Sequence, residues 1–272
     1  MRWGPAVRAA GEAACDLLFP RRCPFCDRPV PMSPQAPFRT LACPSCEEKV
    51  RMLSPVRDAL CCRCGKPLEN SAAEYCSDCL RTRHVYERGC AVYRFRDVSG
   101  PIYRFKYNGR AEYAAYFGRR MAERFRGEFD PAGADMLVPV PLSAERLRSR
   151  GWNQAALLAR VLGQETGIPV REDLLTRRIS TEAMRGLGAE ERRRKLKSAF
   201  LFTGDDVKSK VCVLVDDIYT TGATMDACSR ELLRAGARGI FFITLSIGQD
   251  LRDAPSGGGT PESGAGHGVF LH

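Results

Sequence analysis

The clearest hydrophobic pattern in the chain is a short apolar run at residues 212–215, bounded by charge on both sides and followed at once by Asp216 and Asp217. A continuous apolar run with two valines is typical of a strand buried on both faces of a parallel sheet. The two aspartates therefore lie at the carboxyl end of that strand. In open α/β sheets ligands bind in the crevice outside those ends, so a binding site is expected here.

A hydroxyl-rich loop and then a helix follow the strand. Apolar positions at helical spacing continue as far as Leu233, and Gly236 stands where a glycine commonly ends a helix. The free amides and the dipole at the start of such a helix favour a phosphate group. The residues expected to form this phosphate-binding loop are Thr220, Thr221, Gly222, Ala223 and Thr224.

A phosphate site beside two carboxylates fits a sugar phosphate such as ribose 5-phosphate. The phosphate would bind the loop amides, while Asp216 and Asp217 accept hydrogen bonds from the ribose hydroxyls or bind a divalent cation through water. The P-loop pattern and the glycine-rich dinucleotide pattern are both absent from the sequence. The alternative to a phosphate site is a solvated turn with an ordinary helix N-cap.

Other elements of the same domain follow from hydrophobic periodicity. Strands are expected at residues 91–95, 136–140, 198–202 and 240–245. A turn followed by an amphipathic helix rich in aromatic residues is expected within residues 102–125.

Two groups of basic residues near these elements are candidates for binding pyrophosphate. Lys106 and Arg110 flank a turn at an Asn-Gly pair, although such residues are as often simply solvated. The loop after residues 136–140 carries three arginines close to a glycine, and Asn153 is a plausible N-cap for a helix from Gln154. The three arginines of this loop are Arg146, Arg148 and Arg150.

Cysteines give a second strong pattern in the first third of the chain. Eight of the thirteen cysteines form four C-x-x-C pairs, and thiols in a chain without an export signal point to metal rather than to disulfides. Two such pairs complete a closed tetrahedral zinc site, so we expect two structural zinc ions. The pairs are Cys23 with Cys26, Cys43 with Cys46, Cys61 with Cys64, and Cys76 with Cys79.

Sequential pairing of these knuckles into two zinc ribbons is the favoured arrangement, and a cross-braced pairing stays open. Catalytic zinc is disfavoured because all three histidines lie outside the pairs. Cys62 is an alternative ligand to Cys61, although the spacing favours Cys61. The remaining four cysteines are interpreted as small buried hydrophobic residues. These are Cys15, Cys90, Cys212 and Cys228.

The composition indicates a basic globular protein with a net charge of +10 before zinc is counted. This charge suits phosphate-rich ligands or nucleic acid without identifying the partner. The basic residues between the knuckles are equally consistent with a nucleic-acid-binding surface and with a pair of ribbons that serves only as a structural cap. No apolar run is long enough to span a membrane, and residues 1–19 lack a cleavage site, so an amphipathic helix and a cytoplasmic location are expected.

Taken together, the four knuckles and the motifs V-P-V-P-L, R-G-W-N-Q-A and V-D-D-I-Y-T-T-G-A-T resemble the ComF family of double zinc ribbon, phosphoribosyltransferase-like proteins over about residues 12–248. The last motif resembles the signature of enzymes that use phosphoribosyl pyrophosphate. The resemblance implies a type I phosphoribosyltransferase-like α/β fold with an open, mostly parallel sheet and flanking helices. It also implies a link to DNA uptake in natural transformation or to phosphoribosyl metabolism.

The implied organisation is an N-terminal helix at residues 1–20, a double zinc ribbon at 21–84, a phosphoribosyltransferase-like domain at 85–248 and a disordered tail at 249–272. The arginine-rich segment 177–197 resembles the mobile hood that closes over the reacting centre in these enzymes. The family pattern in this hood has two amides. Here Met184 and Lys195 occupy those positions, beside Thr181 and Arg192, which puts the acceptor substrate and catalysis itself in question.

Two functional hypotheses follow. In the first, the protein is a magnesium-dependent enzyme that transfers ribose 5-phosphate from phosphoribosyl pyrophosphate to an unknown acceptor. Asp216 and Asp217 hold the ribose, the threonine loop holds the 5-phosphate, and the arginine loop holds the leaving pyrophosphate. In the second, it is a non-catalytic module that binds single-stranded DNA beside the DNA uptake proteins.

Overall fold

The computed structural model of the chain describes residues 20–30, 41–53, 59–178 and 198–248. The predicted N-terminal helix and tail lie outside these ranges. So does the hood from residue 179 onward, with Thr181, Met184, Arg192 and Lys195.

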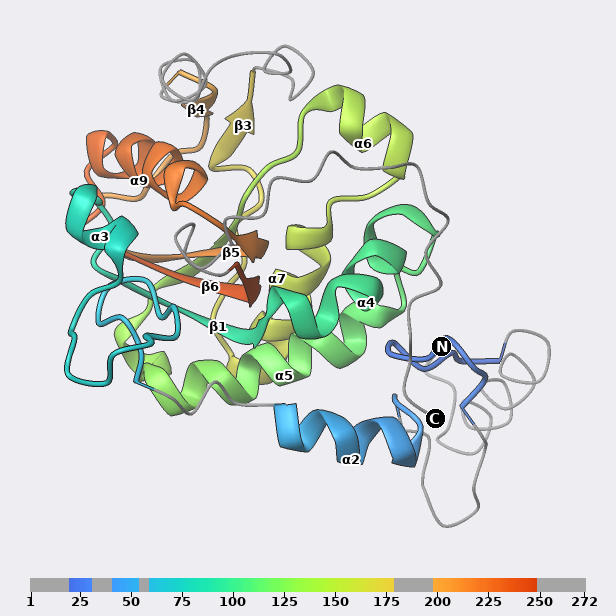
Figure 1. Cartoon of the computed structure of the whole chain (residues 1–272). Coiled ribbons are helices and arrows are strands. Elements are labelled where there is room, and N and C mark those ends of the chain that lie inside the picture. The colour runs from blue at the N-terminus through green and yellow to red at the C-terminus, as the bar shows by residue number, and fades with distance from the viewer. Residues whose placement is uncertain (1–19, 31–40, 54–58, 179–197, 249–272) are drawn as a thin grey trace, which may run out of the picture.

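The apolar run at residues 212–215 is part of an inner strand of a four-stranded parallel sheet. The strand order is β1 (Arg88–Arg94), β6 (Gly239–Ile247), β5 (Val211–Tyr219) and β2 (Met136–Pro139). Each neighbouring pair in this order is parallel. In Figure 1 the arrowheads of β5 and β6 therefore point the same way, toward α4 and α6. The predicted open parallel sheet with flanking helices is confirmed.

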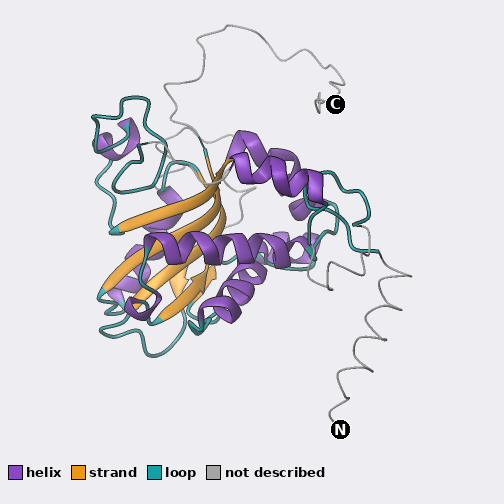
Figure 2. Ribbon diagram, turned by 90° about the horizontal axis from the view of Figure 1, so that it is seen from below, coloured by secondary structure: helices purple, strands orange, loops and turns teal. Residues whose placement is uncertain are grey.

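Alternate residues of β5 face two different cores, because successive side chains of a strand point to opposite faces of a sheet. Val213 and Val215 pack in the core that contains α4 (Phe95–Tyr107), α5 (Tyr113–Glu128) and α7 (Gln154–Thr166). Cys212 and Leu214 pack in the core that contains α9 (Ala223–Arg234). Figure 2 shows helices packed along the twisted layer of strands. The sheet is covered on both faces, as the continuous apolar run predicted.

A small antiparallel hairpin adds to the second core. It pairs β3 (Leu175–Arg177) with β4 (Phe200–Phe202), and Leu174, Leu175 and Phe200 are buried there. The remaining described elements are α2 (Pro44–Leu53), α3 (Ser77–Arg81), the 3₁₀ turn Pro131–Gly133 and α6 (Ala144–Arg150).

Two helices of the larger domain, α4 and α6, are present where the sequence predicted none, and α2 and α3 were not predicted in the ribbons either. Helix α4 contains Gly100 and Pro101, and its backbone is non-helical at Val98. Proline is tolerated in the first turn after such a kink, since the missing amide would have no partner there. The predicted loop after β2 is helix α6, with Ser143 as its N-cap accepting from the amide of Arg146. The prediction that Arg146, Arg148 and Arg150 lie on a loop is therefore wrong.

Other local predictions are confirmed. Asn153 is the N-cap of α7, and its side chain accepts from the amide of Ala155. Gly236 has a φ of 101° and donates its amide to Leu233 O, which ends α9 in the way a C′ glycine does. Gly109 has a φ of 70° in the turn between α4 and α5.

The packing of α5 on α7 gives a direct test of this fold. A Cβ added at Gly118 of α5 would lie 2.4 Å from Val161 Cβ, whereas a Cβ at Gly127 of the same helix meets nothing within 4 Å. We expect Gly118→Ala to lower the free energy of unfolding by about 1–3 kcal/mol through overpacking. Gly127→Ala is expected to raise it by about 0.5 kcal/mol through helix propensity. Urea denaturation measures both, and equal effects would contradict the close helix contact.

Candidate functional site

The two adjacent aspartates lie within β5, which runs two residues further than predicted, to Tyr219. Residue 216 pairs with Thr244 of β6, so both carboxylates belong to the carboxyl half of the sheet. Lys106, near the end of α4, places its Nζ 2.9 Å from Asp217 Oδ2. Both side chains are largely buried, so the ion pair is shielded from water. The structure thus brings together three of the predicted site residues.

Asp216 is held in an unusual protonation state. Burial, and then the neighbouring charge of Asp217, raise the pKa of Asp216 to about 7. A hydrogen bond from the backbone amide of Asp217 to Asp216 Oδ1, 2.8 Å long, opposes this rise, as do the charges of Lys106 and Arg177. A carboxyl group with a pKa near 7 loses its proton readily when a cation arrives.

Arg177 at the end of β3 interacts electrostatically with Asp216, and sequence reasoning had assigned it only to the hood. Burial lowers the pKa of Arg177, the charge of Arg146 from α6 lowers it further, and Asp216 opposes them. Its guanidinium also lies over the ring of Phe200, 5.3 Å from the centroid. Arg177 therefore interacts electrostatically with both Asp216 and Arg146. The buried Leu174 and Leu175 before Arg177 were the signal for the strand that carries it.

The other predicted basic residues are directed elsewhere. Arg150 donates to Gln154 Oε1 at 3.0 Å and to the hydroxyl of Tyr107 at 3.1 Å. Arg110 donates to Asp27 Oδ2 at 3.2 Å, which ties it to the first zinc ribbon. Arg148 is exposed on α6. Of these three, Arg150 contacts the helix that carries Lys106, through Tyr107.

The predicted phosphate loop leads directly into α9. Thr220 and Thr221 are exposed, and Gly222 is the helix N-cap with a φ of 78°. Within the described part of the chain no side chain caps this helix, and the first internal bond runs from the amide of Asp226 to Gly222 O. Ala223 and Thr224 form the first turn, where amides have no partner inside a helix. An anion is the natural partner for them.

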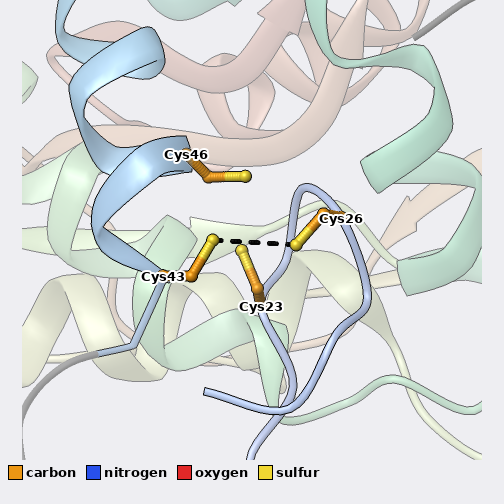
Figure 3. Close-up of side chains that lie close together, drawn as sticks. All are labelled: Cys23, Cys26, Cys43 and Cys46. Atoms are coloured by element: carbon orange, nitrogen blue, oxygen red, sulfur yellow. Dashed lines mark hydrogen bonds between the residues drawn. The ribbon is translucent and has the colours of Figure 1, made fainter. Parts of the chain in front are cut away.

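The eight paired cysteines form two groups in the sequential pairing, and Figure 3 shows the first of them, with the sulfur atoms of Cys23, Cys26, Cys43 and Cys46 turned toward one another. The second group is Cys61, Cys64, Cys76 and Cys79, and in each group the sulfur atoms lie within 4.8 Å of one another. Cys62 is exposed and belongs to neither group. Cys90, Cys212 and Cys228 are buried, as expected, while Cys15 lies outside the described residues.

The geometry of both groups fits zinc. A tetrahedral ion with Zn–S bonds of about 2.3 Å separates its sulfurs by about 3.8 Å. The Sγ atoms of Cys26 and Cys43 are 3.7 Å apart, and those of Cys64 and Cys76 are 3.6 Å apart. Four thiols with no histidine or carboxylate form a closed structural shell.

The first C-x-x-C knuckle of each group, Cys23–Cys26 and Cys61–Cys64, has the same backbone geometry. The residue after the second cysteine has a positive φ, 59° at Asp27 and 75° at Gly65. Its amide bonds back to the first cysteine, to Cys23 O at 2.9 Å and to Cys61 O at 2.9 Å. The second pair of each group begins a helix, α2 in the first ribbon and α3 in the second. Helix N-termini favour negative charge and therefore favour thiolates.

The ribbons dock on opposite faces of the sheet. Phe25 of the first packs edge-on against Tyr116 and Phe117 of α5, with ring centroids 5.4 Å and 6.1 Å apart. Cys61 and Cys64 of the second are buried in the core that contains α9. The segment that the sequence suggested as one small module is thus divided between the two cores of the larger domain.

Curated relatives match most of the chain. The competence protein ComFC of Bacillus subtilis is 30% identical over 203 residues, which cover 71% of this chain and 78% of that protein. The DNA utilization protein YhgH of Salmonella typhimurium is 32% identical over 228 residues, which cover 81% of this chain and 94% of that protein. The chain belongs to the ComF family. A family model described as a double zinc ribbon domain also matches residues 14–80, so the two four-cysteine groups of this ComF protein are two structural zinc sites.

Two solved phosphoribosyltransferases align with about half of this chain. A purine phosphoribosyltransferase from Pyrococcus horikoshii is 20% identical with a TM-score of 0.29, covering 48% of this chain and 70% of that chain. A hypoxanthine phosphoribosyltransferase from Staphylococcus aureus is 12% identical with a TM-score of 0.32, covering 50% of this chain and 64% of that chain. Among the described residues, no helix is long and apolar enough to cross a membrane.

The raised pKa of Asp216 has a testable consequence for stability. Its carboxyl binds a proton more tightly in the folded chain, with a pKa of about 7, than at the ordinary value of 3.8. The resulting stabilisation is complete below pH 3.8 and is lost as the pH rises through about 7. In metal-free buffer at pH 8 we expect Asp216→Asn to raise the free energy of unfolding by roughly 2 kcal/mol, with little change at pH 4.

Asp217→Asn is the matched variant. It leaves the largely buried Lys106 without its ion-pair partner, so stability at pH 8 is expected to fall by roughly 2–3 kcal/mol. Urea denaturation of both variants at the two pH values provides the measurement. Changes of the same sign at pH 8 would contradict the different environments assigned to the two aspartates, among the described residues an unpaired carboxylate at Asp216 and an ion pair with Lys106 at Asp217.

Proposed function

We propose that this ComF protein binds phosphoribosyl pyrophosphate with magnesium and transfers its ribose 5-phosphate group to an acceptor. The observation that carries the proposal is the convergence, at one edge of the sheet, of the start of α9, two adjacent carboxylates and the basic groups of Lys106 and Arg177. A ligand that has a phosphate, vicinal hydroxyls and a pyrophosphate matches all three features.

Each group then has a defined task. The amides of residues 220–224 hold the 5-phosphate at the start of α9. Asp216 and Asp217 accept from the ribose 2′- and 3′-hydroxyls, directly or through magnesium-bound water. Arg146, Arg177 and Lys106 stabilise the charge that develops on the leaving pyrophosphate. Magnesium, when bound, would neutralise part of the same charge and replace the proton on Asp216.

The test is release of pyrophosphate from phosphoribosyl pyrophosphate and magnesium with a panel of nucleophilic acceptors. We expect Asp216→Asn to reduce turnover about 100-fold or more, because a charge that positions the ribose is lost. Asp205→Asn removes the same charge from an exposed position and should leave turnover unchanged. If calorimetry detects no binding of phosphoribosyl pyrophosphate to the unaltered protein, the proposal is wrong.

A second candidate function, binding of single-stranded DNA, is supported by an aromatic surface beside the same edge. Tyr103 and Tyr107 of α4 are 59% and 57% exposed, with ring centroids 5.0 Å apart. The guanidinium of Arg150 lies 4.8 Å from the centroid of Tyr107. Exposed tyrosines with an adjacent arginine suit stacking of unpaired bases. The relatives named for competence and for DNA utilization are consistent with such a partner.

Substitution of the two tyrosines tests this candidate. Tyr103→Ala with Tyr107→Ala is expected to weaken binding of single-stranded DNA by about 10-fold or more, since stacking contributes about 1–3 kcal/mol per base. The matched variant, Tyr103→Phe with Tyr107→Phe, keeps both rings and should bind like the unaltered protein. Fluorescence anisotropy at several salt concentrations measures the affinity. Equal binding by all three proteins would exclude this surface.

A further inference from the structure

The second zinc ribbon reaches the phosphate loop through the short segment that follows it, residues 84–86. Gly222, the N-cap of α9, is packed directly against this segment. A Cβ added at Gly222 would lie 2.7 Å from His84 Cε1 and 3.0 Å from the hydroxyl oxygen of Tyr86. It would also lie 2.6 Å from the hydroxyl oxygen of Tyr219, the last residue of β5. The middle of the loop is therefore packed against the segment.

Two buried hydrogen-bonded bridges fix these contacts. The carboxylate of Asp226, in the first turns of α9, lies 2.9 Å from His84 Nδ1 and accepts from the amide of Val85 at 3.0 Å. The hydroxyls of Tyr86 and Tyr219 are 2.6 Å apart. His84, Asp226, Tyr86 and Tyr219 are each at most 5% exposed. One bridge thus holds α9, which follows the loop, and the other holds β5, which precedes it.

The same segment is tied to the knuckle of the second zinc site. Arg63, between ligands Cys61 and Cys64, donates to His84 O at 3.3 Å and to Tyr86 O at 3.2 Å. Arg63 O in turn accepts from the amide of Gly89 at 2.8 Å. In Figure 1, α3 of this ribbon lies beside α9. A continuous set of buried and partly buried contacts therefore joins the metal ligands to the loop.

The first ribbon makes its described contacts elsewhere. Arg104 donates to Pro24 O at 3.1 Å, Tyr113 donates to Asp27 Oδ1 at 2.5 Å, and Tyr116 donates to Glu47 Oε2 at 2.8 Å. These partners belong to α4 and α5, on the opposite face of the sheet. The chain thus supplies a matched control in which a buried tyrosine hydroxyl bonds a zinc ribbon without approaching residues 220–224.

We propose that the second zinc site positions the phosphate loop, with Arg63, His84 and Tyr86 as positioning residues that hold residues 220–224 ready for an anion. The proposal rests on the proposed function for the identity of the ligand, a ribose phosphate. This zinc ion then positions the phosphate loop as well as stabilising its own ribbon. Because coupling between two sites is reciprocal, a ligand in the loop must also stabilise zinc at Cys61, Cys64, Cys76 and Cys79.

The first experiment needs no ligand. Amide hydrogen exchange of Asp226, whose amide closes the first turn of α9 onto Gly222 O, is compared among the unaltered protein, His84→Ala, Tyr86→Phe with Tyr219→Phe, and the control Tyr113→Phe. We expect exchange at least about 10-fold faster in the first two variants and unchanged in the control. His84→Asn, which keeps a donor near the place of Nδ1, should restore most of the protection. Equal exchange in all proteins, or faster exchange throughout the fold, would overturn the positioning role.

The second experiment measures the coupling. Zinc is withdrawn with a zinc-selective chelator, and the freed cysteines are alkylated and assigned by mass spectrometry, with and without ribose 5-phosphate. We expect the ligand to slow alkylation of the second group several-fold and to leave the first group unchanged. Slowing of both groups alike, or of neither while calorimetry shows that ribose 5-phosphate binds, would overturn the proposal. If ribose 5-phosphate does not bind at all, the proposed function fails, and the exchange experiment still decides the positioning role.

Discussion

Two adjacent carboxylates on a strand that is covered on both faces create the constraint around which the rest of the site is built. Water cannot stabilise both charges there, so one aspartate is paired with Lys106 and the other has a pKa near neutrality. The lysine has to come from α4, on one side of the sheet, and the nearby Arg177 comes from the hairpin on the other side. The site is therefore assembled from both layers of the fold, and its charge balance changes when a cation or an anion enters.

The zinc ribbons follow the same two-layer plan. Each is too small to form a hydrophobic core of its own, so metal–thiolate bonds replace much of the missing burial. The apolar residues that each ribbon does have are used to cover a different face of the sheet. This arrangement explains how two knuckles with nearly identical backbones come to have different neighbours: Asp27 meets α4–α5 side chains, whereas Gly65 lies against the backbone of β1.

The sequence predicted best those features that are built from residues close together in the chain. The run from residue 212 to Thr224 carries strand, carboxylates, loop and helix start in order, and the C-x-x-C pairs carry their own ligand geometry. It predicted least well those features whose structure depends on contacts with distant parts of the chain. Pro101 concealed α4 because a kinked helix has no simple period, and the arginines of α6 looked like a loop because that short helix has no buried residue. Arg177 was missed as a site residue because its place depends on a hairpin partner, Phe200, more than twenty residues away.

The division of the ribbons between the two faces of the sheet also determines what a truncation of the N-terminal segment would expose. Residues 20–84 look in the sequence like a detachable appendage, yet Phe25 fills one core and Cys64 the other. Removal of that segment would strip apolar cover from both sides of β1 at once. Residues 85–248 therefore depend on the ribbons to bury apolar surface on both faces of that edge strand.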